Sequence, residues 1–273
     1  MTSVESREVA ELNDPVTNHT RPNILALDTS ARRTSIALAR GDRIVESLAV
    51  DGDERRSERL WLDIGGLLEG AGLGVEAIEL FGVCVGPGGF TGLRVGLAAV
   101  KGLASATDKP VAGVTSLEAA AMAAHGAAMV CAMVGAYKGE VYWQLFTFDE
   151  GGLPVARSEP VVSTSTGAIA AVADLSDVVF VGDAAEASRE VIRNIAGARF
   201  VEAANEQRGG WRAPQTHQNV AEAVARLAYL KWQQGRVETA ATVEALYVRP
   251  AEAEVKRSLG LLGSKIARNR RAD

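Results

Sequence analysis

The sequence contains few residues of the kinds that build metal centres and disulfides. Its three histidines are isolated, and no His-x-x-x-His or Cys-x-x-Cys spacing occurs among its 273 residues. Neighbouring residues therefore cannot assemble a metal site, and we expect none. The two cysteines, Cys84 and Cys131, are far apart and both lie in apolar runs. This setting is typical of buried free thiols in a reducing compartment and argues against a disulfide.

Long apolar runs and an excess of basic residues are also missing. No stretch approaches the roughly 20 apolar residues that cross a bilayer, and the polar N-terminus has no apolar signal-peptide core. We therefore expect a soluble, cytoplasmic protein with no membrane partner. The formal net charge of −5 argues against a protein that coats nucleic acid unaided, because phosphate neutralisation requires clustered Lys and Arg. Any contact with RNA must be local or shared with another protein.

Neither common nucleotide-binding fingerprint is complete, although one glycine-rich turn is prominent. Phe81–Val85 is an apolar run, Gly86–Gly92 is rich in glycine, and Leu93–Ala106 carries apolar residues at helical spacing. This order predicts a strand, a tight turn and a helix that Thr91 caps. The turn lacks the lysine of a P-loop and the third glycine of the Rossmann pattern. Two interpretations stay open: the helix start binds a phosphate, or the glycines only permit positive φ and close packing.

The elements predicted from periodicity repeat once along the chain, which indicates duplication of one α/β unit. Each half contains three strands, then alternating helices and strands, with a glycine-led turn after the fourth strand at Gly86 and Gly182. In the second half we predict a single strand over 155–162 and a single helix over 184–196. The expected domains are a disordered extension (1–21), a first half (22–114), a second half (115–250) and a flexible basic tail (251–273).

The repeated unit resembles the ribonuclease H-like half of the actin, hexokinase and Hsp70 superfamily. This resemblance implies an α/β fold of two such halves that close on a nucleotide. In that superfamily an acid ends the first strand, and Asp28 occupies this position in the sequence. An aspartate that only accepts backbone hydrogen bonds within its own turn is the alternative. The candidate phosphate or nucleotide contacts are Asp28, Gly86, Gly88, Gly89, Thr91 and Gly92.

Five motifs together resemble the TsaB family, also called YeaZ, over about residues 23–255. They are Gly86–Arg94 (GPGGFTGLR), Lys101–Leu103, Gly113–Leu117, Gly139–Tyr142 and Tyr247–Arg249. The resemblance implies a non-catalytic partner that binds and activates TsaD, the enzyme that moves a threonylcarbamoyl group to the adenosine beside the anticodon of certain tRNAs. It also implies TsaE as a second partner, tRNA bound through the complex, and a homodimer when TsaD is absent. No cofactor of its own is implied, and ATP or ADP at the complex interface is one option.

The same resemblance implies that two helices, over 57–69 and 93–106, form the interface with TsaD or with another copy of the chain. Small residues on the second helix would let a partner helix approach closely. The predicted interface residues are Leu60, Trp61, Ile64, Leu93, Val95, Gly96, Ala99 and Val100.

The sequence also departs from the family pattern. Gly135-Ala136-Tyr137, followed by Lys138, stands where the family usually has Asp-Ala-Arg. An acid and an arginine are lost together, which weakens the case for a small-molecule site between the halves.

Two rival functions belong to other classes. An independent kinase-like enzyme would use Asp28 as a base or metal anchor and would need a second phosphate loop, for which Gly182-Asp183-Ala184 is too plain. A peptidase-like hydrolase would need a nucleophile beside a base, which the isolated histidines do not offer.

The tail carries Lys and Arg that could help to hold tRNA, although a merely solvated charged tail is the alternative.

Overall fold

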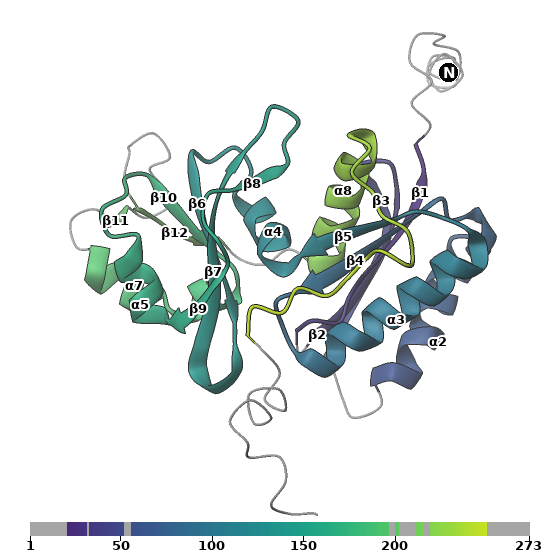
Figure 1. Cartoon of the computed structure of the whole chain (residues 1–273), viewed down its shortest axis with the longest axis horizontal. Coiled ribbons are helices and arrows are strands. Elements are labelled where there is room, and N and C mark those ends of the chain that lie inside the picture. Colours follow the sequence, from purple (N-terminus) through teal and green to yellow (C-terminus); the bar gives the residue numbers. More distant parts are fainter. Residues whose placement is uncertain are drawn as a thin grey trace, which may run out of the picture.

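The computed structural model describes residues 21–249 apart from 32, 52–55, 197–199, 202–210 and 216–218. It contains two β-sheets, each flanked by helices, which lie side by side (Figure 1). The predicted fold class, an α/β protein of two ribonuclease H-like halves, is confirmed. The predicted extension up to residue 20 and the predicted basic tail lie outside the described residues. Within the described part of the chain, no helix is both long and apolar enough to cross a bilayer.

The first sheet has the strand order β3-β2-β1-β4-β5. Its three N-terminal strands form the predicted antiparallel meander, and β4 and β5 run parallel to β1. The central strands are almost wholly apolar because helices cover both faces of the sheet. The strands are β1 (Asn23–Asp28), β2 (Arg33–Arg40), β3 (Arg43–Asp51), β4 (Leu80–Gly86) and β5 (Val111–Thr115).

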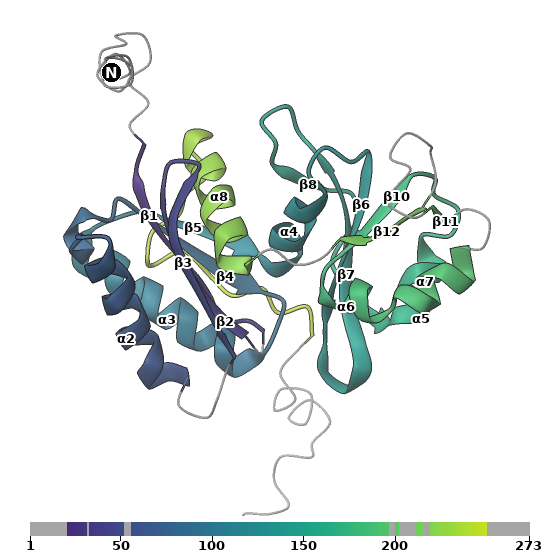
Figure 2. The same cartoon turned by 180° about the vertical axis from the view of Figure 1, so that it is seen from behind.

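Helices from both ends of the sequence cover this sheet. Its α2–α3 face is packed by α2 (Arg56–Gly70) and α3 (Phe90–Thr107), with the short η2 (Val75–Ala77) leading into β4. The opposite face is packed by α8 (Val220–Gln233), the last helix of the described chain, as Figures 1 and 2 show from opposite sides. The predicted division at residue 115 had grouped α8 with the second half, whereas in the structure it lies on the first sheet.

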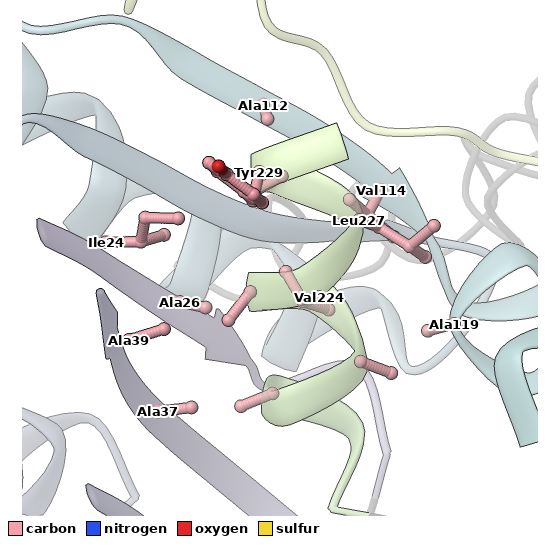
Figure 3. Close-up of a cluster of buried hydrophobic side chains, with 14 of the residues drawn as sticks. Ile24, Ala26, Ala37, Ala39, Ala112, Val114, Ala119, Val224, Leu227 and Tyr229 are labelled. Carbon is pink, nitrogen blue, oxygen red and sulfur yellow. The ribbon is translucent and has the colours of Figure 1, made fainter. Parts of the chain in front are cut away.

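The docking of α8 depends on very small side chains. Figure 3 shows Val224, Leu227 and Tyr229 of α8 against alanines of β1, β2 and β5. A Cβ added to Gly82 of β4 would lie 3.2 Å from the Val224 Cγ1 atom and 3.2 Å from the Ala228 Cβ atom. The absence of a side chain at Gly82 therefore sets how closely α8 approaches the sheet.

The second sheet repeats the plan of the first, in the order β11-β12-β10-β6-β7-β8, with β9 also paired to β7. One face is packed by α5 (Ser165–Ala171), α6 (Asp183–Ala187) and α7 (Arg189–Ala196), and the other by α4 (Ser116–Ala121) and η3 (Met122–Ala124). The strands are β6 (Met129–Gly135), β7 (Glu140–Phe148), β8 (Pro154–Ala156), β9 (Val161–Thr164), β10 (Val178–Val181), β11 (Phe200–Val201) and β12 (Trp211–Gln215), with η4 (Tyr137–Gly139) between β6 and β7.

Several predicted elements in the second half were wrong in detail. The single strand over 155–162 is two strands, β8 and β9, with Pro160 in the break between them. The single helix over 184–196 is two helices, because the backbone of Ser188 leaves helical geometry after α6. Strand β12 was not predicted, since its sequence, Trp-Arg-Ala-Pro-Gln, lacks an apolar alternation.

The duplication of the α/β unit extends to one pair of equivalent glycines. Gly86 ends β4 and Gly182 follows β10, the strand at the corresponding place in the second half, and both have a φ of +102°. A side chain at Gly182 would overlap the carbonyl oxygen of Met133. Both halves therefore use a glycine for the same turn, for the same steric reason.

The close approach of α8 to β4 can be tested by filling the space at Gly82. We expect Gly82→Val to lower the free energy of unfolding by about 1–3 kcal/mol, because the added methyl groups would push α8 away from the sheet. Gly102→Ala is the control: among the described residues, no atom outside the helix backbone lies within 4 Å of the new Cβ. This variant should gain about 0.5–1 kcal/mol from helix propensity. Urea unfolding of both variants measures the difference, and equal stabilities would contradict the packing argument.

Candidate functional site

The end of β1 forms a buried polar turn, Asp28-Thr29-Ser30. Asp28 is 1% exposed, and its Oδ1 atom accepts a hydrogen bond of 2.9 Å from the backbone N–H of Ser30. This is the local bond that the alternative interpretation of Asp28 required, so part of the carboxylate is used to shape its own turn.

The glycine-rich turn after β4 packs directly against the β1 turn. The backbone N–H of Gly89 donates to the Ser30 carbonyl oxygen at 2.7 Å, and the Thr29 hydroxyl donates to the Gly92 carbonyl oxygen at 2.7 Å. A Cβ on Gly88 would lie 2.6 Å from that same Ser30 oxygen. Close packing, which the sequence left as one of two interpretations, is therefore present at Gly88.

Helix α3 starts three residues earlier than the sequence predicted. Its N-cap residue is Gly89, which has no side chain to cap the helix, and Thr91 is exposed within the first turn. The prediction that Thr91 caps the helix is therefore wrong. The physical reason is that glycine is also accepted at the N-cap, so the turn does not need the hydroxyl.

A cavity of about 480 Å³ lies between the two halves. This volume is in the range of small-molecule sites. Elements of both halves and α8 line it, and most of its apolar wall is alanine. The lining residues with polar side chains are Asp28, Ser30, Arg33, Ser35, Ser116, Asp183 and Asn219.

Of the six predicted phosphate or nucleotide contacts, Asp28 alone lines this cavity. Gly86, Gly88, Gly89, Thr91 and Gly92 are not among its lining residues. The structure brings the glycine turn to Asp28 through Ser30, but it does not place the turn in the cavity wall. Ser116 connects the two regions, since its hydroxyl donates to the Pro87 carbonyl oxygen at 2.6 Å.

The polar residues that the sequence missed owe their place to tertiary packing. Ser35 in β2 accepts a hydrogen bond of 3.1 Å from the backbone N–H of Ala221, in the first turn of α8. Asn219 caps the same helix end. The cap signal of Asn219 was readable in the sequence, but its approach to β2 was not.

Asp183 is the charged residue that the second half contributes to the lining of this cavity. It begins α6, and its Oδ1 atom accepts hydrogen bonds from the backbone N–H groups of Gly135, at 3.0 Å, and Ala184, at 2.8 Å. The structure thus joins Asp183 to the end of β6.

Cys84 is a buried residue of β4 and lies near Asp28. Its Sγ atom is 3.4 Å from the Ser30 hydroxyl. Burial raises the pKa of this thiol well above its ordinary value, and the negative charge of Asp28 raises it further. The thiol therefore stays protonated, which is the opposite of what a cysteine nucleophile requires.

Most of the predicted interface residues are covered by the chain itself. Gly96 lies against Thr29, so this small residue serves packing within the first half. Trp61 is 50% exposed and Val95 is partly exposed, so these two retain surface for a partner. The interface itself stays a prediction. The buried members are Leu60, Ile64, Leu93, Gly96, Ala99 and Val100.

After α8 the chain forms a strap, residues 236–249, that returns to the glycine turn. The strap pairs with Val111 through Glu238, and the backbone N–H of Leu246 donates to the Val85 carbonyl oxygen at 2.7 Å. Its Tyr247 hydroxyl accepts a hydrogen bond of 3.3 Å from Arg94. The Tyr247–Arg249 motif is therefore placed next to the Gly86–Arg94 motif.

The packing of the glycine turn on Ser30 generates a stability prediction. We expect Gly88→Ala to lower the free energy of unfolding by ~1 kcal/mol or more. The new Cβ would clash with the backbone of Ser30, which cannot move aside as easily as the end of a flexible side chain. Gly86→Ala should cost a similar amount through its φ of +102°. Gly66→Ala on α2 has open space among the described atoms and is the control. Thermal unfolding at fixed pH measures all three; melting temperatures that match the wild type would refute the role of the turn.

Comparisons with known proteins agree on one family. A family model described as TsaD, tRNA N6-adenosine threonylcarbamoyltransferase, matches residues 53–256. The tRNA threonylcarbamoyladenosine biosynthesis protein TsaB of Bacillus subtilis is 28% identical over 242 residues, which cover 85% of this chain and 96% of that protein. The protein of the same name from Escherichia coli is 33% identical over 133 residues, and there the match covers 48% of this chain and 57% of the relative.

Solved structures lead to the same family. A Pseudomonas aeruginosa protein, described as having similarity to the peptidase YeaZ, superposes with a TM-score of 0.66 at 27% identity. The match covers 84% of this chain and all of that one. YeaZ from the same organism gives a TM-score of 0.63 at 25% identity, over 83% of this chain and 99% of that one. From its motifs, its two ribonuclease H-like halves and these matches, the chain belongs to the TsaB (YeaZ) family of threonylcarbamoyltransferase-related proteins.

Proposed function

We propose that this chain is a non-catalytic subunit that binds and activates TsaD in a complex that forms threonylcarbamoyladenosine beside the anticodon of tRNAs. The names of its relatives support a role in the synthesis of threonylcarbamoyladenosine in tRNA. The match to the TsaD family model supports a sequence relationship between this chain and TsaD. TsaE is the second proposed partner, and tRNA is proposed to bind through the complex.

The observation that carries the proposal is an exposed apolar pair on α2. Leu62 is 76% exposed and Trp61 is 50% exposed, although most apolar residues of this helix are buried in the first core. Adjacent large apolar side chains that keep this much surface are typical of a partner site.

Small residues around this pair would let a helix of the partner approach. Gly65 and Gly66 on α2 and Gly102 on α3 have no described atom within 4 Å of an added Cβ, beyond the helix backbone itself. Unlike Gly96, these glycines leave open space outside the chain. We propose that this α2–α3 surface, defined by Trp61, Leu62, Gly65, Gly66 and Gly102, replaces the buried residues of the sequence-based prediction.

The same surface is proposed to form the homodimer when TsaD is absent. One patch cannot be buried against two partners at once, so self-association and TsaD binding should exclude each other. An independent kinase or a peptidase is the alternative function, and it would require turnover by the purified chain without TsaD.

A charge on the α2–α3 surface tests this proposal. We expect Leu62→Glu to weaken TsaD binding and self-association about tenfold or more, because the carboxylate would lose its hydration against the partner. Val45→Glu is the control, since Val45 on β3 is 51% exposed and is not one of the residues that define the α2–α3 surface. Calorimetric titration with TsaD and sedimentation of each variant alone give the two affinities.

Two outcomes would refute the proposal. In the first, Leu62→Glu binds TsaD with wild-type affinity while remaining folded. In the second, the wild-type chain adds nothing to the rate of tRNA modification by TsaD.

We also propose that the cavity between the halves binds ATP or ADP. Two features of the cavity support this proposal. Its walls are mostly alanine, which leaves room for a planar base, and two of its lining residues, Asp28 and Asp183, carry carboxylates that could accept hydrogen bonds from ribose hydroxyls. Because the glycine turn is not part of this wall, the phosphates would have to leave the cavity toward Arg33 or toward a partner protein.

Filling the cavity tests the nucleotide proposal. We expect Ala120→Phe to reduce ATP and ADP binding about tenfold or more, because the ring would occupy the space that the base needs. Ala120 lines the cavity on α4 and is only partly buried, so the helix should tolerate the change. Titration calorimetry with the chain alone and with the TsaD complex measures the loss. Wild-type nucleotide affinity in the filled variant would place the nucleotide elsewhere.

A further inference from the structure

Two aromatic–cation pairs stand at the surface where the halves meet. In the first half, the Arg94 guanidinium carbon lies 3.7 Å from the centroid of the Phe90 ring. In the second half, the Lys138 ammonium nitrogen lies 5.4 Å from the centroid of the Tyr137 ring. Both distances are within the range of a cation–π interaction.

The strap joins these pairs. The Tyr247 ring lies 5.5 Å from the Phe90 ring, and its hydroxyl accepts a hydrogen bond from Arg94. Two residues further, Arg249 forms an ion pair of 2.7 Å with Glu140, which directly follows η4. Two residues span at most about 7 Å of backbone, so the strap brings both pairs to one surface. Figures 1 and 2 show the strap ending between the two halves.

The aromatic rings of this surface are open to solvent. Tyr137 is 70% exposed, Tyr247 is 44% exposed and Phe90 is 38% exposed. Lys138 has a φ of +62°, a left-handed conformation that is costly for a lysine. A costly backbone held at an exposed aromatic–cation pair is consistent with a functional position.

Charge around these rings is locally positive on a chain whose net charge is −5. Arg94, Lys138 and Arg249 supply three cations, and Glu140 is already paired with Arg249. In sequence the chain continues from Arg249 into residues 250–273, which contain six Lys or Arg and three Asp or Glu. Cations interleaved with exposed rings suit the phosphates and bases of single-stranded nucleic acid.

We propose that this inter-half surface, defined by Phe90, Arg94, Tyr137, Lys138 and Tyr247, binds unpaired bases of an RNA strand. The open rings stack on the bases, and the two cations contact neighbouring phosphates. The inference rests on the proposed function, in which the substrate of the complex is an RNA, and it assigns a direct RNA contact to this subunit. The α2–α3 surface remains free for TsaD.

Binding of a labelled single-stranded 12-nucleotide RNA to the full chain tests the stacking part. We expect Tyr137→Ala to weaken binding about fivefold or more, and Tyr137→Phe to restore it, because stacking needs the ring and not the hydroxyl. Arg94→Lys should weaken binding while the charge is kept. Val45→Ala, which removes an exposed apolar side chain on β3, is the control and should bind like the wild type.

The salt dependence of binding separates charge from stacking. In Lys138→Asn the cation is removed, and the new asparagine tolerates the left-handed backbone at this position. This variant should lower the slope of log affinity against log salt by about 1, whereas Tyr137→Ala should leave the slope unchanged.

The reconstituted complex with TsaD and tRNA decides whether the contact operates in modification. We expect Tyr137→Ala to raise the KM for tRNA about fivefold or more, with the affinity for TsaD unchanged. The inference is overturned if Tyr137→Ala and Arg94→Lys leave both RNA affinity and KM at wild-type values, or if the surface binds free ATP but no RNA. Failure of the wild-type chain to stimulate modification would instead refute the proposed function, and the oligonucleotide measurement would still decide this inference.

Discussion

The packing of α8 on the first sheet is the interaction on which the remaining architecture depends. The chain leaves the first half after β5, builds the whole second half and then returns to cover the open face of the first sheet. Gly82 and the alanines of the sheet make this return possible, since each is small enough for α8 to lie close. The first half cannot complete its core without α8, which follows the second half in the sequence, so the two are expected to fold as a unit.

This return also creates the cavity. Asn219, Val220 and Ala223 at the start of α8 form part of its wall, opposite residues from the β1 turn. After α8, the strap passes the glycine turn, where Leu246 bonds to Val85, and ends at Arg249, which forms an ion pair with Glu140 of the second half. The cavity, the turn and the inter-half surface are therefore consequences of one helix and the segment that follows it.

The first half presents different chemistry on different sides. Its α2–α3 surface is apolar and rich in glycine, which suits a protein partner, whereas the strap side carries rings with cations, which suits RNA. Under the two proposals, this division lets one subunit bind TsaD on one side and RNA on another. The thiol of Cys84 fits this picture, because its raised pKa keeps it as an uncharged core group between the sheet and the β1 turn.

The sequence by itself determined most elements of the first half, the repetition of the unit and the family. Apolar runs, glycine stops and the GPGGFTGLR motif are local, so β1, β4 and the duplicated turn at Gly86 and Gly182 could be predicted from neighbouring residues. Small residues on α3 were also visible, but Gly96 proved to face Thr29 inside the chain while Gly102 faces open space, and periodicity could not separate the two. Only the tertiary structure decided which sheet α8 covers, that Ser35 of β2 meets the backbone of Ala221 in that helix, and that Tyr137 and Tyr247 are brought to one surface by the strap. These contacts join residues tens to hundreds of positions apart, and nothing in local propensity records which distant backbone will approach.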